Sequence, residues 1–229
     1  MALTLDPALI ARRQLHVVLV LDCSGSMRGD RIASLSYALR AALPELRDVA
    51  AENPEIDVRV RVLRFGEGAA WLVRDGVPVD QLDWPQLDAT GHSHLGAALA
   101  AVAEALDAGS GGARQLPPVI VLASDGYPTD DVDAGLAALF ASAQGAAAVR
   151  IAIAIGADAD MAVLNRFIGN PALQPLRAGN AAQLVDHIRW ATTAPVKAAS
   201  APVNAPDPLA ALARTRRDDA AGVSSDLIW

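Results

Sequence analysis

Residues 17–26 read VVLVLDCSGS, a run of apolar residues that favours a β-strand and then stops at Asp22. Two hydroxyl side chains follow on alternate residues, Ser24 and Ser26, so the segment has the pattern D-x-S-x-S. In α/β proteins, ligands bind at the carboxyl ends of the strands. We therefore expect these side chains to meet at a ligand site.

A divalent metal ion is the ligand that suits these side chains. Carboxylate and hydroxyl oxygens are hard donors, and the segment holds no histidine. Such donors favour Mg²⁺, with Ca²⁺ or Mn²⁺ as alternatives, over Zn²⁺ or Cu²⁺. The rest of the chain must then supply the ligands that are missing.

The composition indicates one domain with a modest extension. The chain has 229 residues, of which 52% are hydrophobic, which is enough for a large core. No apolar stretch reaches the roughly 18 residues that a membrane span needs, and the first residues do not match a signal peptide. The single cysteine, Cys23, excludes an internal disulfide, so we expect a cytoplasmic protein.

The net charge of −7 argues against nucleic-acid binding, which uses clustered lysine and arginine to neutralise phosphates. Arginines do gather at 59–64 and at 214–217. We interpret both groups as solvated surface.

The periodicity of apolar residues predicts alternating strands and helices. Residues 56–65 alternate apolar and charged side chains, as in a half-exposed strand near a sheet edge, and residues 71–73 follow as the second arm of a hairpin. Pro44 is expected to kink or split the first helix. The other buried strands are predicted at 118–123 and 149–155, and the helices at 29–50, 94–106, 132–143, 161–168 and 182–190.

This order predicts an α/β fold, a doubly wound, Rossmann-like and mostly parallel sheet that is flanked by helices and has one antiparallel edge strand. We place the domain at residues 1–194. Residues 195–229 are rich in alanine and proline and are expected to form a flexible or docking tail. Asp226, near the apolar end of that tail, is a candidate to reach a surface of the domain or its metal ion.

Two further segments carry a hydroxyl or a carboxylate next to a predicted helix or strand. Ser93, in the sequence Gly91-His-Ser-His-Leu-Gly96, directly precedes a predicted helix, and Asp125 follows the predicted strand 118–123. Together with D-x-S-x-S, these segments resemble the metal-ion-dependent adhesion site (MIDAS) of von Willebrand factor A (VWA) domains. The resemblance covers about residues 12–192. Ser93 replaces the family's threonine, which keeps the hydroxyl and loses the methyl group.

The resemblance implies a role for each of these residues. Ser24, Ser26 and Ser93 would bind the ion directly or lie close to it, and Asp22 and Asp125 would act through bound water. The last coordination position would be left for an Asp or Glu of a protein partner. The alternatives are helix N-capping by the serines and a turn role for Asp125 before Gly126.

Residues beside these ligands are candidates for partner contact. Met27, Arg28 and Tyr127 are expected to surround the ion and to form the contact surface. His92 and His94 flank Ser93 and could contact a partner or a softer metal, although simple loop exposure explains them as well. Cys23 is interpreted as a small buried residue and not as a reactive thiol.

Within the VWA family, the chain resembles the TerY type, which is associated with tellurium resistance and bacterial stress operons. The residues that carry this likeness are those at 124–131, Ser-Asp-Gly-Tyr-Pro-Thr-Asp-Asp, with Phe167 and the segment 190–193. TerY-type proteins are encoded beside kinases and phosphatases, so the resemblance implies partners of those classes.

Three functions compete. The first is a non-catalytic, metal-dependent interaction module, favoured because no general base or nucleophile pair accompanies the metal ligands. The second is a scaffold subunit of a larger machine, such as an AAA+ ATPase, a chelatase or a kinase–phosphatase complex. The third is a metal-dependent phosphohydrolase of the D-x-D type, disfavoured because Ser24 stands where such an enzyme has its acid/base carboxylate.

Overall fold

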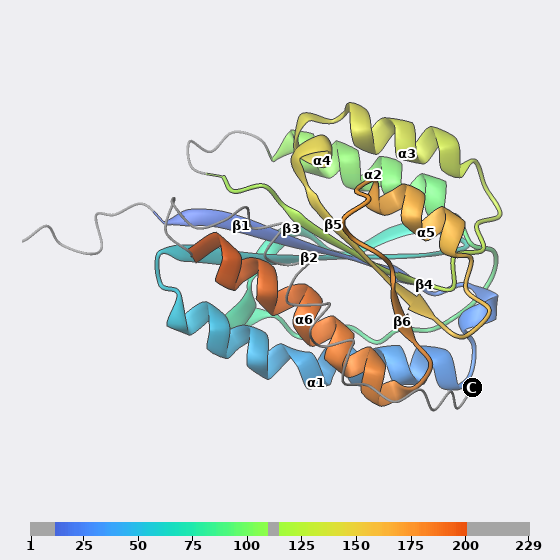
Figure 1. Cartoon of the computed structure of the whole chain (residues 1–229), viewed down its shortest axis with the longest axis horizontal. Coiled ribbons are helices and arrows are strands. Elements are labelled where there is room, and N and C mark those ends of the chain that lie inside the picture. The colour runs from blue at the N-terminus through green and yellow to red at the C-terminus, as the bar shows by residue number, and fades with distance from the viewer. Residues whose placement is uncertain (1–11, 110–114, 201–229) are drawn as a thin grey trace, which may run out of the picture.

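The computed structural model describes residues 12–109 and 115–200. Within these ranges, six strands form one sheet in the order β3-β2-β1-β4-β5-β6 (Figure 1). Every neighbouring pair is parallel except β2 and β3. This confirms the predicted fold class, including the antiparallel edge strand. The strands are β1 (Arg13–Asp22), β2 (Ile56–Gly66), β3 (Gly68–Pro78), β4 (Val119–Ser124), β5 (Val149–Ile155) and β6 (Leu176–Ala178).

Helices cover both faces of the sheet (Figure 1). One face carries α1 (Asp30–Glu52) and α6 (Ala181–Ser200), which pack against each other. The other face carries α2 (Leu95–Ala108), α3 (Val132–Ala141), α4 (Ala143–Ala147) and α5 (Met161–Ile168). Alternate residues of the central strand β1 fill a separate hydrophobic cluster on each face. This is why its sequence is apolar without interruption.

The strand order brings together the two strand ends that position the candidate site. From β1 the chain builds the sheet outward through β2 and β3, and it then returns to the opposite side of β1 with β4. The helices that follow β1 and β4, α1 and α3, lie on opposite faces (Figure 1). Such a switch point opens a crevice at the carboxyl ends of its two strands.

The first helix does not split at Pro44, so the split, one of the two expected effects of this proline, is wrong. α1 is one continuous helix from Asp30 to Glu52, and Pro44 lies on its exposed side. Proline deprives the carbonyl of Arg40 of its helical donor, but water can reach that exposed side and satisfy it. Packing of the opposite, buried side holds the helix together.

Other elements differ from the expected bounds. The helix predicted at 132–143 ends at Ala141, because the Ser142 hydroxyl accepts a hydrogen bond from the Gly145 amide (3.1 Å) and starts a separate short helix. The three-residue strand β6 was not predicted, since so short a segment has no periodicity. α6 runs to Ser200, past the composition change at 195, because Val196 is fully buried in the core.

Residues 201–229, including Asp226, lie outside the described ranges, so the predicted docking of the tail stays a prediction. Within the described ranges, no helix combines the length and the apolar character that a membrane span requires.

His16, on β1, lies in the core at the end of the sheet opposite the crevice, next to the buried Arg61 of β2. The Arg61 guanidinium donates a hydrogen bond to the carbonyl of Ala105 near the end of α2 (2.8 Å). Burial first, and then the charges of Arg61 and Arg59, lowers the pKa of His16 from 6.5 to about 4. The folded protein therefore holds this imidazole in its neutral form.

This lowered pKa predicts a specific loss of stability in acid. Between pH 6.5 and about 4 the unfolded chain binds a proton at His16 that the folded chain does not bind, so stability falls as the pH decreases through this window. His16→Gln removes the proton uptake and should reduce the acid-induced loss by about 2 kcal/mol between pH 7 and pH 5. Urea unfolding at several pH values measures it.

The control for this prediction is the exposed His92, and His92→Gln should retain the pH dependence of the wild type. Parallel pH profiles for His16→Gln and the wild type would contradict the account of His16.

Candidate metal centre

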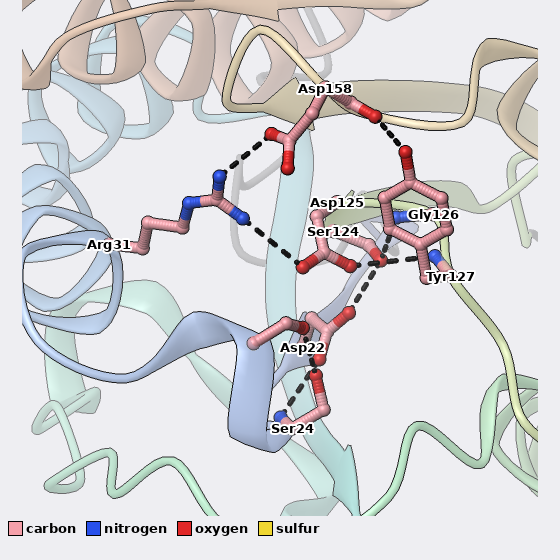
Figure 2. A network of polar contacts seen from close by, with 9 residues as sticks. Asp22, Ser24, Arg31, Ser124, Asp125, Gly126, Tyr127 and Asp158 are labelled. Atoms are coloured by element: carbon pink, nitrogen blue, oxygen red, sulfur yellow. Dashed lines mark hydrogen bonds and ion pairs between the residues drawn. The ribbon is translucent and has the colours of Figure 1, made fainter. Parts of the chain in front are cut away.

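Asp22 is the last residue of β1, and its side chain is fully buried. The backbone amide of Ser24 donates a hydrogen bond to Asp22 Oδ1 (2.9 Å), and the Ser124 hydroxyl donates one to Oδ2 (2.6 Å; Figure 2). Burial raises the pKa of Asp22; the hydrogen bonds from Ser124 and Ser24 oppose this rise, and the charge of Asp125 adds to it. The carboxylate is held firmly but is short of positive charge.

The hydroxyl oxygens of Ser24 and Ser26 lie 3.0 Å apart. Ser24 stands before a short 3₁₀ turn, Gly25–Met27, and its side chain makes no capping hydrogen bond. Helix α1 begins only after Gly29. The capping alternative is therefore not observed for Ser24. Ser26 is exposed, so this side of the site is open to solvent.

Ser93 has a buried hydroxyl oxygen without a hydrogen-bond partner among the described residues. Its backbone is fully engaged, because its amide donates to Thr129 Oγ1 (3.1 Å) and its carbonyl accepts from the Thr129 amide (2.8 Å). Leaving a buried polar group unpaired costs about 1–3 kcal/mol. A buried hydroxyl without another partner is free to bind a cation through its oxygen.

Backbone hydrogen bonds bring the loop of Ser93 against the end of β1. The Gly25 amide donates to the carbonyl of Gly91 (2.9 Å), and the Thr90 amide donates to the carbonyl of Cys23 (2.7 Å). The loop that carries Ser93 is thereby fixed beside the turn that carries Ser24 and Ser26.

The loop after β4 fixes the other side of the Ser93 segment. Asp130 accepts hydrogen bonds from the amides of Gly96 and Ala97 at the start of α2 (3.0 and 2.9 Å). A Cβ atom at Gly96 would lie 2.2 Å from the carbonyl oxygen of Asp131, so this close approach requires glycine. The loop of Ser93 is consequently hydrogen-bonded on one side to the turn after β1 and on the other side to the loop after β4.

Asp125 directly follows β4 and is also fully buried. One of its oxygens accepts from the amide of Tyr127 (3.4 Å), and the other pairs with Arg31 Nη1 (3.4 Å; Figure 2). Arg31 also pairs with Asp158 (2.7 Å), whose carbonyl accepts a hydrogen bond from the Tyr127 hydroxyl. Asp125 thus belongs to a polar network and is more than a turn residue.

The donors of this site fit a hard divalent cation. Of the two buried carboxylates, only Asp125 pairs with an arginine among the described residues, so negative charge remains in excess. Hydroxyls that make no competing hydrogen bond to the backbone lie at the same strand ends. Ser24, Ser26 and Ser93 would hold the ion with the two carboxylates.

The predicted contact residues next to these ligands separate into exposed and buried ones. Arg28 and Tyr127 are exposed, and Tyr127 retains 48% of its surface. Met27 is fully buried in the core beneath α1, which corrects its predicted role in a contact surface. Its apolar side chain packs inward from the turn Gly25–Met27, between two solvent-facing neighbours.

His92 and His94 stack their rings with centroids 6.0 Å apart. His94 Nδ1 accepts a hydrogen bond from the Gly68 amide (2.9 Å), so this ring anchors the β2–β3 turn, while His92 is exposed and available to a partner. No group of three or more His, Cys, Asp or Glu within the described ranges is placed to hold a metal, which gives the softer-metal alternative no support. The D-x-S-x-S site is of another kind, since three of its five candidate ligands are hydroxyls.

Cys23 lies between two ligand candidates but is fully buried. Burial raises the pKa of its thiol to about 12, so the residue is not a reactive thiolate, as the sequence indicated.

Three residues of this network were not among the predicted site residues: Arg31, Ser124 and Asp158. Ser124 left a signal, because a hydroxyl ends an otherwise apolar strand just before Asp125. Arg31 and Asp158 gave no such signal in the sequence, because charged residues are common in helices and loops. Only the fold brings them together with Asp125.

Comparisons with known proteins agree with the fold. Residues 16–186 match the family model of the von Willebrand factor type A domain. A search among curated proteins finds no match.

Solved structures share the fold at low sequence identity. A von Willebrand factor type A protein from Catenulispora acidiphila is 18% identical, with a TM-score of 0.60, over 80% of this chain and 42% of that one. The pilus adhesin SpaC from Lactobacillus rhamnosus GG, in its open conformation, is 15% identical, with a TM-score of 0.63, over 81% and 31%. The PilB minor pilin from Streptococcus sanguinis is 15% identical, with a TM-score of 0.60, over 85% and 64%.

The matched part of each of these structures is less than two thirds of its length. Their likeness shows the fold, and the family match spans most of this chain. The chain therefore belongs to the von Willebrand factor type A domain family.

Proposed function

We propose that this domain is a non-catalytic, metal-dependent protein-interaction module. Asp22, Ser24, Ser26, Ser93 and Asp125 would hold one divalent ion, with Mg²⁺ first and Ca²⁺ or Mn²⁺ as alternatives. When bound, the ion supplies an electrophilic position that an Asp or Glu of a protein partner can complete. The observation that carries this proposal is the buried Ser93 hydroxyl, which has no partner among the described residues and lies in a loop hydrogen-bonded to the turn that follows the buried Asp22.

The protein's own residues would prepare this position for a partner. Ser124 and the Ser24 amide orient the carboxylate of Asp22, and Thr129 orients the backbone of Ser93. Since Ser26 and the neighbouring Arg28 are exposed, a partner can approach from that side. Neutral hydroxyl ligands leave the bound ion with residual positive charge, which favours an acidic partner.

The wider context is also part of the proposal. The closer resemblance to TerY-type proteins, carried by the residues at 124–131, leads us to infer an adaptor in a bacterial stress response of the tellurium-resistance kind, with kinases or phosphatases as partner classes. The second candidate is a scaffold subunit of an AAA+ ATPase or chelatase, which would use the same metal position. A phosphohydrolase is disfavoured because Ser24 cannot act as general acid or base.

The first prediction concerns Ser93→Ala. This change deletes an unpartnered buried hydroxyl, so the metal-free protein should be as stable as the wild type or slightly more stable. The same change removes a metal ligand, so Mg²⁺ or Mn²⁺ should bind at least about tenfold more weakly. Calorimetry and thermal unfolding with and without the metal measure both effects.

Ser93→Thr is the matched variant. It keeps the hydroxyl and adds a methyl group that restricts its rotamers, so metal binding should be retained or strengthened. Metal affinity that is equal in wild type and Ser93→Ala would contradict the assignment of Ser93 as a ligand.

The second prediction concerns Asp22→Asn. An amide of the same shape removes the negative charge and one of the two acceptor oxygens that Asp22 offers to a cation. Added Mg²⁺ or Mn²⁺ should then stabilise the wild type but not the variant. Denaturant unfolding of both proteins with and without metal measures this.

Asp186→Asn, at an exposed position of α6 outside the predicted ligand set, makes the same change of net charge and should keep the metal response of the wild type. An Asp22→Asn variant that still responds to metal as the wild type does would speak against the site.

The third prediction concerns partner capture from the native host. Proteins retained by the wild-type domain in Mg²⁺ should be lost in a chelator, and also lost with Asp22→Ala in Mg²⁺. Quantitative mass spectrometry of the three samples measures this, with the exposed Asp186→Asn as the control variant outside the predicted ligand and contact residues. Partners that survive both changes would reject metal-dependent recognition.

A further inference from the structure

Arg31 occupies a specific position beside the candidate metal centre. It lies in the first turn of α1, and its side chain is 22% exposed. Its guanidinium spans two carboxylates, with Nη1 3.4 Å from Asp125 Oδ2 and Nη2 2.7 Å from Asp158 Oδ1 (Figure 2). The first of these carboxylates is a predicted metal ligand, and the second is not.

The surrounding backbone leaves room for this guanidinium. Gly156 has a positive φ of 92°, and a Cβ atom there would lie 2.9 Å from Arg31 Nη2 and 2.8 Å from Asp158 Oδ1. The Tyr127 hydroxyl donates to the carbonyl of Asp158 and ties the loop after β5 to the loop after β4. Arg31, on α1, is therefore in contact with two further segments, the loop after β4 and the loop after β5.

The charges explain why a cation is needed there. Asp22 and Asp125 are both fully buried, and Arg31 is the one cationic side chain among the described residues that pairs with either of them. A guanidinium cannot lose its proton in a protein. It therefore reduces the excess negative charge when no metal is bound, and it repels a divalent ion that binds to the same carboxylate.

We propose that Arg31 is a built-in counter-cation that competes with the metal ion for Asp125 and so sets the metal concentration at which the site fills. The pair with Asp158, at 2.7 Å, is the shorter of the two contacts and holds the guanidinium next to the site when Asp125 turns to the metal. This inference rests on the proposed function, since it requires a metal bound by Asp125.

The proposal predicts two opposite effects of Arg31→Gln. Without metal, the variant should unfold at a lower temperature, because the buried Asp125 carboxylate loses its counter-charge. With metal, the repulsion is gone, so Mn²⁺ or Mg²⁺ should bind at least about tenfold more tightly and raise the unfolding temperature by more than in the wild type. A residue with only a structural role would lower stability and metal affinity together.

Two further variants make the test specific. Arg40→Gln makes the same change of net charge at an exposed position on the same helix and should leave metal affinity near that of the wild type. Arg31→Lys keeps the charge but cannot span both carboxylates, so its metal affinity should lie between those of the wild type and Arg31→Gln. If Arg31→Gln does not fold without metal, this lysine variant decides the question.

The measurement is calorimetric titration of each metal-free protein with MnCl₂, paired with thermal unfolding. If the wild type binds Mn²⁺ and Arg31→Gln binds equally or more weakly, the proposal for Arg31 is overturned and the metal centre stands. An equal gain in Arg31→Gln and Arg40→Gln also overturns it, because the effect would then be one of net charge. A wild type that binds neither Mn²⁺ nor Mg²⁺ overturns the proposed function, and this inference with it.

Discussion

Two carboxylates, Asp22 and Asp125, are buried at the carboxyl ends of neighbouring parallel strands, and the local structure is arranged around their charge. Removing an ion from water costs several kcal/mol unless other groups compensate. Here the compensation comes from the Ser124 hydroxyl, two backbone amides and the guanidinium of Arg31. These groups leave the pair short of positive charge, which is a strong physical argument for a cation.

The sheet order explains why these two residues meet. β4 pairs with β1 on the side opposite β2, so the strand end at Asp125 comes beside the strand end at Asp22 although the chain has meanwhile formed β2, β3 and α2. The Ser93 loop is then held between them by Thr90 and Thr129. The Ser93 hydroxyl is buried without a partner among the described residues, and this lowers the stability of the fold. Such local costs concentrate at functional sites.

Much of this arrangement could be predicted from local patterns. The apolar runs before Asp22 and before Asp125 identify two buried strands. Each strand ends at a carboxylate, which implies a shared site. Properties that depend on distant packing could not be predicted. The burial of Met27, the extension of α6 to Ser200 and the pairing of Arg31 with Asp125 across 94 residues all follow from tertiary contacts that no short window contains.

The central claim is that a hard divalent cation binds among the hydroxyls of Ser24, Ser26 and Ser93. Its most direct test is a crystal structure of the domain grown with MnCl₂, with diffraction data collected at the manganese absorption edge. The account predicts one anomalous peak within about 2.0–2.6 Å of these hydroxyl oxygens. Manganese at another place, such as the stacked rings of His92 and His94, or no anomalous peak at a saturating concentration, would contradict it.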